Sequence, residues 1–323
     1  MKLSFILIFF LSFLDLRHSF GQSQFPDTIS LKNMETSVRL KGTRVFLTIP
    51  SNYKLREKAT SYQAFEKNSV TGIQIIENVN DNFYRFKNEF LKKPSGLKNR
   101  DNGNSKAVKI GNFNGFFYTG PFKKPNEKSM ILIFGDSSFA VTLIGVFPTT
   151  DKITEAEIIN TFKTISYDKF INFDPLELEN FKFDISITGF KYVPLIGMNS
   201  FTYSTDGKLK SIEDERHKSS FEFETYEYPN IERAKKIINN KIQERTEFGI
   251  SKVSNVQKRS ININGYPAFE TTMDEKGEYV ADSKFYIVII EKEKTAVLFW
   301  GVDRDNGKWI EKYKSTVQSI KFE

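Results

Sequence analysis

The feature that most constrains the fold is an internal repeat, because one series of apolar residues and glycines occurs in both halves of the 323-residue chain. At a spacing of 153 residues, Val108, Ile110, Phe113 and Phe116 match Ile261, Ile263, Tyr266 and Phe269. At a spacing of 156 residues, Ala140, Val141, Gly145 and Val146 match Ala296, Val297, Gly301 and Val302. At a spacing of 155 residues, Ile165, Tyr167 and Asp168 match Ile320, Phe322 and Glu323. Loop insertions between matching elements produce such small drifts. The repeat predicts two diverged copies of one α+β module, at residues 38–168 and 174–323. The segment between them, residues 169–173, lacks Gly, Pro and Ser, so we expect the modules to pack together.

The order of predicted elements is the same in both copies. A strand at residues 72–77 precedes a helix at residues 80–93, and an alternating strand at residues 220–226 precedes a helix that Asn230 is expected to cap. The buried faces of these helices are predicted to be Phe83, Phe86 and Phe90 in the first copy and Ile231, Ala234, Ile238 and Ile242 in the second. The long apolar runs at residues 139–147 and 295–302 predict central strands that are buried on both faces and covered by helices.

A closing helix is predicted at the end of each copy. Thr154 and Glu157 have the spacing of a capping box, and the second closing helix is expected to start near Asn306 and Gly307. The predicted buried stripes are Ile158, Phe162 and Ile165 in the first helix and Trp309, Tyr313, Val317 and Ile320 in the second. Predicted turns lie at residues 101–103, 114–115, 206–207 and 276–277. Each module is therefore expected to be a mainly antiparallel sheet with helices on its faces.

The N-terminus has the pattern of a secretory signal peptide. Lys2 precedes an apolar core at residues 5–14, and small residues up to Gly21 offer a cleavage site. The apolar core is too short to cross a bilayer, which needs about 20 residues of helix. We therefore expect residues 1–21 to be removed, residues 22–37 to be a flexible lead-in, and the mature protein to be periplasmic or extracellular without a transmembrane segment.

The chain contains no cysteine. This excludes disulfides, thiolate metal sites, cysteine nucleophiles and the acylated cysteine of a bacterial lipoprotein. The mature protein is therefore expected not to be lipid-anchored, and its fold must be stabilised by burial of apolar surface.

Few residues in the chain are suited to catalysis. His217 is the only histidine beyond the signal peptide and lies in a charged segment, where a solvated loop explains it better than a catalytic base does. Neither half contains Gly-x-Ser-x-Gly, a phosphate-binding glycine loop or a dinucleotide motif. Glu222, Glu224 and Glu227 include an alternating pair that fits the solvent face of a strand. We therefore expect no cofactor and no catalytic site.

The acidic segment at residues 303–307 does not match a calcium loop. Its glycine stands at loop position five, whereas an EF-hand requires it at position six, and the bidentate acidic ligand is missing. We interpret the segment as a strand-to-helix turn in which Asp305 or Asn306 caps the last helix. No metal site is predicted.

Positive charge is concentrated in the first module. It has 20 Lys and Arg against 12 Asp and Glu, whereas the second module has 23 against 25. A basic domain can bind an anionic lipid surface, polymer or protein, although solvation alone also explains the charge. Export disfavours nucleic acid as the partner. The candidate binding surface comprises Lys92, Lys93, Lys98, Arg100, Lys106, Lys109, Lys123, Lys124 and Lys128.

The pattern resembles the PsbP-like family of folds, which includes the bacterial envelope family called DcrB-like. The similar features are an opening strand with a Pro and an aromatic residue (residues 46–53), a helix, a strand at residues 110–117 with Asn-Gly, a long apolar strand, and a final helix that ends at residues 165–167. The resemblance covers nearly all of each module. It implies an antiparallel sheet sandwiched by helices (α/β/α) and a role in binding or scaffolding. It carries over no site residue.

Three functional hypotheses follow. The first is an exported, non-enzymatic binding or scaffold protein of the bacterial cell envelope, whose partner is an unknown protein or an anionic envelope component. The second is an envelope hydrolase that uses carboxylates in a cleft between the modules. The third is a structural or stress-related protein that binds another protein through an exposed apolar patch.

Overall fold

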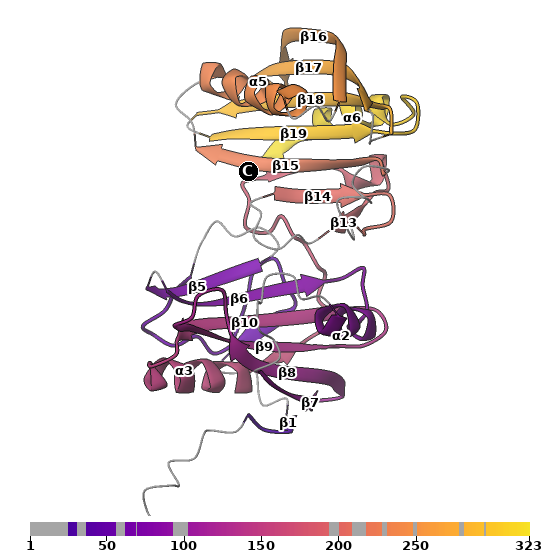
Figure 1. Ribbon diagram of the computed structural model, residues 1–323. Coiled ribbons are helices and arrows are strands. Elements are labelled where there is room, and N and C mark those ends of the chain that lie inside the picture. Colours follow the sequence, from indigo (N-terminus) through magenta and orange to yellow (C-terminus); the bar gives the residue numbers. More distant parts are fainter. Residues whose placement is uncertain are drawn as a thin grey trace, which may run out of the picture.

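The computed structural model describes most of the chain. The described residues are 25–30, 37–55, 62–68, 70–92, 103–193, 200–208, 218–227, 231–247, 251–277, 281–293 and 295–323. They form two large sheets and two small ones, and the structure is mostly β with few helices (Figure 1).

The first large sheet has eight strands in the order β1-β7-β8-β9-β10-β6-β5-β4. Its strands are β1 (Thr28–Ile29), β4 (Lys54–Leu55), β5 (Tyr62–Asn68), β6 (Thr71–Asn78), β7 (Asn104–Ile110), β8 (Phe113–Pro121), β9 (Glu127–Gly135) and β10 (Ala140–Pro148). All neighbours are antiparallel except β1 and β7, which are parallel. The helices of this half are α2 (Phe83–Lys92) and α3 (Lys152–Lys163), and a small sheet joins β2 (Val38–Arg39), β3 (Val45–Leu47) and β11 (Ser166–Tyr167).

The second large sheet has seven antiparallel strands in the order β13-β14-β15-β19-β18-β17-β16. They are β13 (Lys191–Val193), β14 (Ser200–Ser204), β15 (Ser220–Glu227), β16 (Ser251–Ile263), β17 (Tyr266–Gly277), β18 (Ser283–Lys292) and β19 (Thr295–Asp303). The helices are α5 (Ile231–Glu247), α6 (Ile310–Gln318) and the short 3-10 helix η4 (Ile185–Ile187). A small sheet pairs β12 (Phe181–Lys182) with β20 (Lys321–Phe322).

The two large sheets share one strand connectivity. In each sheet, three strands lead to a helix, four strands then run as an antiparallel meander, and the last of these pairs with the strand before the helix. A closing helix follows, and the short strand after it pairs with a short strand from the start of the same half. Only β1 and β2 have no counterpart among the described strands. The long apolar runs form β10 and β19, which are central and buried as predicted.

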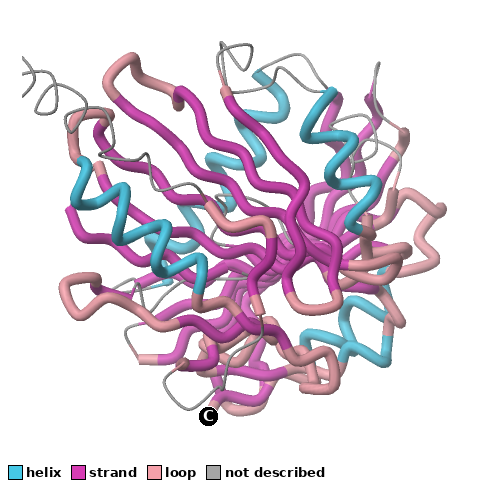
Figure 2. The backbone as a smooth tube through the Cα atoms, turned by 90° about the horizontal axis from the view of Figure 1, so that it is seen from below, coloured by secondary structure: helices cyan, strands magenta, loops and turns pink. Residues whose placement is uncertain are grey.

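Alternation along the strands gives each large sheet two apolar faces. In the first sheet, α2 packs with Phe116, Ile131 and Ile133 on one face. Helix α3 packs with Leu132, Val141 and Leu143 on the other face. Likewise, α5 and α6 contact opposite faces of the second sheet, through the side chains of Ile238, Tyr313 and Val317. Figure 2 shows the helices beside the twisted sheets.

The cap of α3 differs from the predicted capping box. The Asp151 carboxylate accepts hydrogen bonds from the Thr154 backbone N–H at 2.9 Å and from the Thr154 hydroxyl at 2.7 Å. Glu157 instead accepts from Asn52 and Lys67, both at 3.0 Å. The capping box of Thr154 and Glu157 is therefore wrong, because the helix begins earlier, at Lys152, and Thr154 already lies in its first turn.

The start of α6 also differs from the prediction. Its first residue is Ile310, and neither Asp305 nor Asn306 caps it. The buried carboxylate of Asp303 accepts from the backbone N–H groups of Asp305 at 2.7 Å and Trp309 at 2.6 Å. Asp303 therefore stabilises the turn that leads into the helix, and it does so from the end of β19.

Three predicted loop features also need correction. The β7–β8 hairpin turns at Gly111 (φ +55°) and Asn112, with Ile110 opposite Phe113. The predicted turn at residues 114–115 is thus inside β8, and residues 276–277, also predicted as a turn, are the last two residues of β17. In the expected flexible lead-in, residues 25–30 are packed on the first sheet: the Phe25 ring stacks on Phe117 with centroids 4.1 Å apart, and β1 pairs with β7.

The two halves lie with β5 and β13 facing one another, as Figure 1 shows. The Arg39 guanidinium binds both carboxylate oxygens of Glu177, which also accepts from the Gly42 N–H at 2.9 Å. The Asn80 amide donates to the Tyr192 carbonyl at 2.6 Å, and Val79 packs against the apolar core of the second half. These contacts join the modules directly, as the sequence of the connecting segment predicts.

Candidate functional site

The predicted basic surface is divided by the fold. Lys106 and Lys109 are three residues apart on β7, so their side chains point to opposite faces of the sheet. Lys123, Lys124 and Lys128 lie around the turn between β8 and β9, at the end of the sheet away from Lys109. Lys92 ends α2, and Lys93, Lys98 and Arg100 lie outside the described residues.

Several of these lysines are neutralised within the chain. Lys106 pairs with Asp27 at 2.6 Å, Lys124 with Glu127 at 3.3 Å, and Lys128 with Glu155 at 2.7 Å. Burial raises the pKa of Glu155, but hydrogen bonds from Lys128 and Lys152 outweigh it and keep that pKa below its usual value. The Lys123 ammonium lies over the Phe122 ring. Lys109, another member of the predicted basic surface, lines a hollow.

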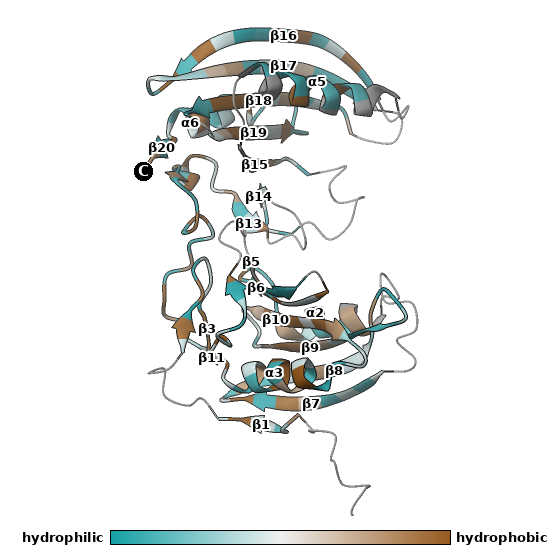
Figure 3. Ribbon diagram, turned by 90° about the vertical axis from the view of Figure 1, so that its left-hand side faces the viewer, coloured by the Kyte–Doolittle hydropathy of each residue, from teal (hydrophilic) through white to brown (hydrophobic). Residues whose placement is uncertain are grey.

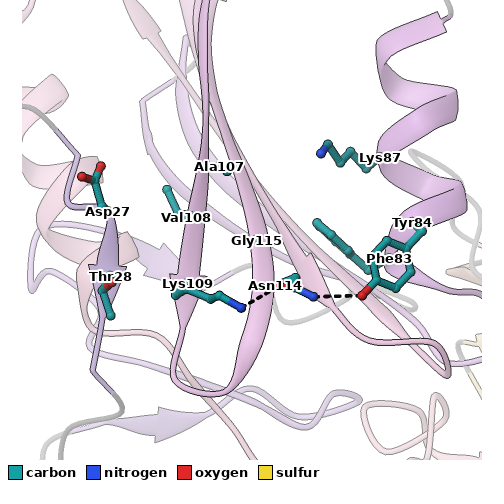
Figure 4. Close-up of a pocket in the computed structure, with 10 residues that line it drawn as sticks. All are labelled: Asp27, Thr28, Phe83, Tyr84, Lys87, Ala107, Val108, Lys109, Asn114 and Gly115. Atoms are coloured by element: carbon teal, nitrogen blue, oxygen red, sulfur yellow. Dashed lines mark hydrogen bonds between the residues drawn. The ribbon is translucent and has the colours of Figure 1, made fainter.

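That hollow lies between α2 and the strands β7 and β8, and it has a volume of about 500 Å³ (Figure 4). Its lining residues are Asp27, Thr28, Phe83, Tyr84, Lys87, Ala107, Val108, Lys109, Asn114 and Gly115. We call it the α2 groove. Thr28 in β1 and Asp27 directly before it are among these residues, so the segment around β1 forms one wall of the groove.

A chain of hydrogen bonds crosses the α2 groove. The Lys109 ammonium donates to the Asn114 side-chain oxygen at 2.6 Å, and the Asn114 amide donates to the Tyr84 hydroxyl oxygen at 2.9 Å (Figure 4). Because an ammonium cannot accept, the amide must present its oxygen to Lys109 and its NH₂ to Tyr84. The Tyr84 proton and the other ammonium hydrogens of Lys109 are therefore left to donate to a ligand.

Lys87 adds a second cation to the α2 groove. Its ammonium lies 5.7 Å from the centroid of the Phe116 ring. Among the described residues, neither Lys87 nor Lys109 pairs with a carboxylate, and Asp27 is already bound by Lys106. The groove thus presents two ammonium groups and a phenol hydroxyl as donors, an arrangement that favours an anionic ligand.

The second module repeats only part of this arrangement. The Lys235 ammonium lies 5.0 Å from the centroid of the Phe269 ring, as Lys87 does over Phe116. The spacing of 153 residues, however, places Asn262 and Pro267 where the first module has Lys109 and Asn114. The hydrogen-bond chain is therefore specific to the first module.

Sequence reasoning found Lys109 but missed Lys87, Tyr84 and Asn114. Tyr84 and Lys87 lie on the flank of α2, whereas the sequence pattern indicates only the buried face of that helix, through its phenylalanines. Asn114 belongs to an Asn-Gly pair, which predicts a turn rather than a strand residue. No short-range sequence signal brings α2 next to β8. The other residues considered for chemistry add no second site: Glu222 and Glu224 lie half-buried on one face of β15, and His217 is outside the described residues.

No group of three or more His, Cys, Asp or Glu side chains that could hold a metal ion occurs within the described part of the chain. Of the helices in that part, none is long and apolar enough to cross a membrane.

No protein-family model matches the chain, and no curated protein matches it either. Solved structures similar to it include one from Bacteroides thetaiotaomicron, with 19% identity and a TM-score of 0.31, covering 43% of this chain and 50% of that one. The chain thus spans half the length of that protein. A Pseudomonas aeruginosa protein of unknown function has 12% identity and a TM-score of 0.28, covering 40% of this chain and 94% of that one. The PsbP protein CyanoP from Synechocystis has 7% identity and a TM-score of 0.33, covering 49% of this chain and 98% of that one.

Proposed function

We propose that this chain is an exported, non-enzymatic binding protein of the bacterial cell envelope, and that the α2 groove is its binding site for an anionic group. The observation that carries the proposal is the excess of hydrogen-bond donors in the groove. Lys87, Lys109 and the Tyr84 hydroxyl surround a hollow in which the one carboxylate, Asp27, is already bound by Lys106. A phosphate or carboxylate group supplies the acceptors that these donors lack.

The architecture that we propose is a tandem duplication of a PsbP-like α/β/α module. Support comes from the common strand order, from the repeat spacing, and from the paired positions of Lys87 on Phe116 and Lys235 on Phe269. Loss of the hydrogen-bond chain in the second copy fits a duplicated module in which one copy keeps the binding site.

A hydrolase remains the alternative, but the described carboxylates at the module junction do not favour it. Glu177 is bound by Arg39 and Asp174 by Lys182. Glu77 is bound by Arg44 and by the Tyr167 hydroxyl. Each acid is thus neutralised by a cation and fixed in a structural contact, rather than poised to exchange a proton.

The test is titration of the mature chain, residues 22–323, with sodium phosphate at constant ionic strength, followed by ¹H–¹⁵N NMR. Saturable shifts of the Lys109, Asn114 and Tyr84 amides are expected. Lys109→Met should weaken binding about tenfold, because one charge-assisted hydrogen bond is lost. Lys235→Met is the matched control in the second module and should bind as the wild type does. Absence of saturable shifts, or equal weakening by both variants, would contradict the proposal.

A further inference from the structure

The outer flank of α2 carries apolar side chains beside the groove. Tyr84 and Leu91 are both 52% exposed, and Lys87 lies between them in the sequence. The spacings of three and seven residues place all three on one flank of the helix. We call this set the α2 ridge. A helix that presents Tyr, Leu and Lys together on a solvent-facing flank has the composition of an interfacial membrane contact.

We propose that the α2 ridge docks on the surface of a bilayer that contains anionic phospholipids, with a lipid phosphate in the α2 groove. This inference rests on the proposed function, because it assigns the anionic group of the groove to a lipid headgroup. Tyr84 has an apolar ring and a polar tip, which suits the level of the headgroups. Leu91 would insert among the upper acyl carbons, while the ammonium of Lys87 remains at the phosphates.

Charge asymmetry supports the same orientation. The first module has eight more basic than acidic residues, whereas the second has two more acidic than basic residues. An anionic surface therefore attracts one half of the molecule and repels the other. The attraction is strongest at low ionic strength, because salt screens charges beyond about 10 Å at 0.1 M.

The experiment is sedimentation of the mature chain with vesicles of phosphatidylcholine containing 30% phosphatidylglycerol, in parallel with vesicles of phosphatidylcholine alone. Binding to the anionic vesicles only is expected, and it should weaken at least about tenfold between 50 and 300 mM NaCl. Leu91→Ser should weaken it about fivefold to tenfold, through loss of apolar burial. Ile153→Ser is the matched control, because Ile153 is an exposed apolar residue (73%) on α3, which covers the other face of the sheet.

The outcomes separate this inference from the proposed function. Phosphate binding in the groove without vesicle binding overturns the membrane inference and leaves the proposed function in place. Equal weakening by Leu91→Ser and Ile153→Ser also overturns it, because the ridge would then have no special role. Failure to bind either phosphate or vesicles overturns both. Because Leu91 and Ile153 are exposed, both variants are expected to fold, and circular dichroism checks this.

Discussion

Gly145 and Gly301 hold equivalent positions under the closing helices of the two sheets. A Cβ added to Gly145 would lie 2.5 Å from Cγ2 of Ile158 in α3, and one added to Gly301 would lie 2.7 Å from Cδ2 of Tyr313 in α6. Distances this short are incompatible with the present packing. Each glycine therefore lets its closing helix approach the central strand of its own sheet.

Substitution of either glycine by alanine is expected to destabilise its own module by about 1–3 kcal/mol through overpacking. Both tryptophans, Trp300 and Trp309, lie in the second module and report on its unfolding. In urea, Gly301→Ala should shift the fluorescence transition, whereas Gly145→Ala should shift mainly the circular dichroism transition. A shifted fluorescence transition in Gly145→Ala together with an unchanged one in Gly301→Ala would contradict this packing.

The cap of α3 provides a test between the predicted and the observed helix start. Asp151→Ala should lower the urea midpoint, whereas Asp151→Asn should retain most of the stability, because asparagine also caps helices well. Glu157→Gln removes only the charge of the ion pair with Lys67, because glutamine still accepts from Asn52, and it should have the smaller effect. Wild-type stability of Asp151→Ala would contradict Asp151 as the cap.

The ion pair between Arg39 and Glu177 is expected to hold the modules together. Glu177→Gln should weaken the junction by about 1–2 kcal/mol, because the ion pair is lost and an amide has only one acceptor oxygen, so that its NH₂ group faces the second N–H of the Arg39 guanidinium. Phe170, with its side chain 88% exposed in the connecting segment, is a ready site for chymotrypsin. Its cleavage should accelerate several-fold in the variant. Arg259→Met, which breaks the ion pair with Glu270 at the outer border of the second sheet, is the control and should cleave at the wild-type rate.

The same ion pair predicts a pH dependence. Burial raises the pKa of Glu177, but the hydrogen bonds from Arg39 and the Gly42 N–H outweigh it, so that the net pKa lies below the ordinary 4.5. A lowered pKa means that the contribution to stability is complete above pH 4.5 and is lost as the pH falls through the folded-state value. The difference in urea midpoint between wild type and Glu177→Gln should therefore shrink on acidification. A difference that stays constant down to pH 3 would show that ionisation of Glu177 is irrelevant.

Phe25 is expected to anchor β1. The backbone N–H of Lys109 donates to the backbone carbonyl of Asp27, and that of Gly111 donates to the backbone carbonyl of Ile29, both at 2.8 Å. Phe25→Ala removes a buried ring, so these two amides should exchange with deuterium much faster, while the Leu132 amide in the sheet centre stays protected. Unchanged exchange at Lys109 would mean that β1 holds without its anchor.

Hydrophobic periodicity predicted the elements that are buried. The phenylalanine stripe of α2 and the apolar runs of β10 and β19 recur in the structure because burial determines both the pattern and the packing. Helix boundaries and turns were harder to predict. At residues 111–115 the Asn-Gly pair is the stronger local signal for a turn, yet the strand register with Ile110 opposite Phe113 decides the position.

The candidate site depends on contacts that sequence cannot show. Lys106 and Lys128 counted toward a basic surface, but their acidic partners, Asp27 and Glu155, are distant in the sequence and become neighbours only in the fold. Conversely, the α2 groove combines a helix flank, a strand residue that resembled a turn, and the N-terminal segment that was expected to be flexible. The basic excess of the first module was therefore predictable from the sequence, whereas the position of the ammonium groups that line the α2 groove was not.

The different borders of the two sheets affect self-association. In the first sheet, β1 closes the outer border over Phe25 and Phe117. In the second, no described strand pairs with the outer side of β16, which arches at the border in Figure 3. At the position of Phe117 and its partner Lys106, the second sheet has Glu270 and Arg259, joined at 2.6 Å. Charged side chains on an edge strand disfavour pairing with a second copy, so this border resists fibre growth.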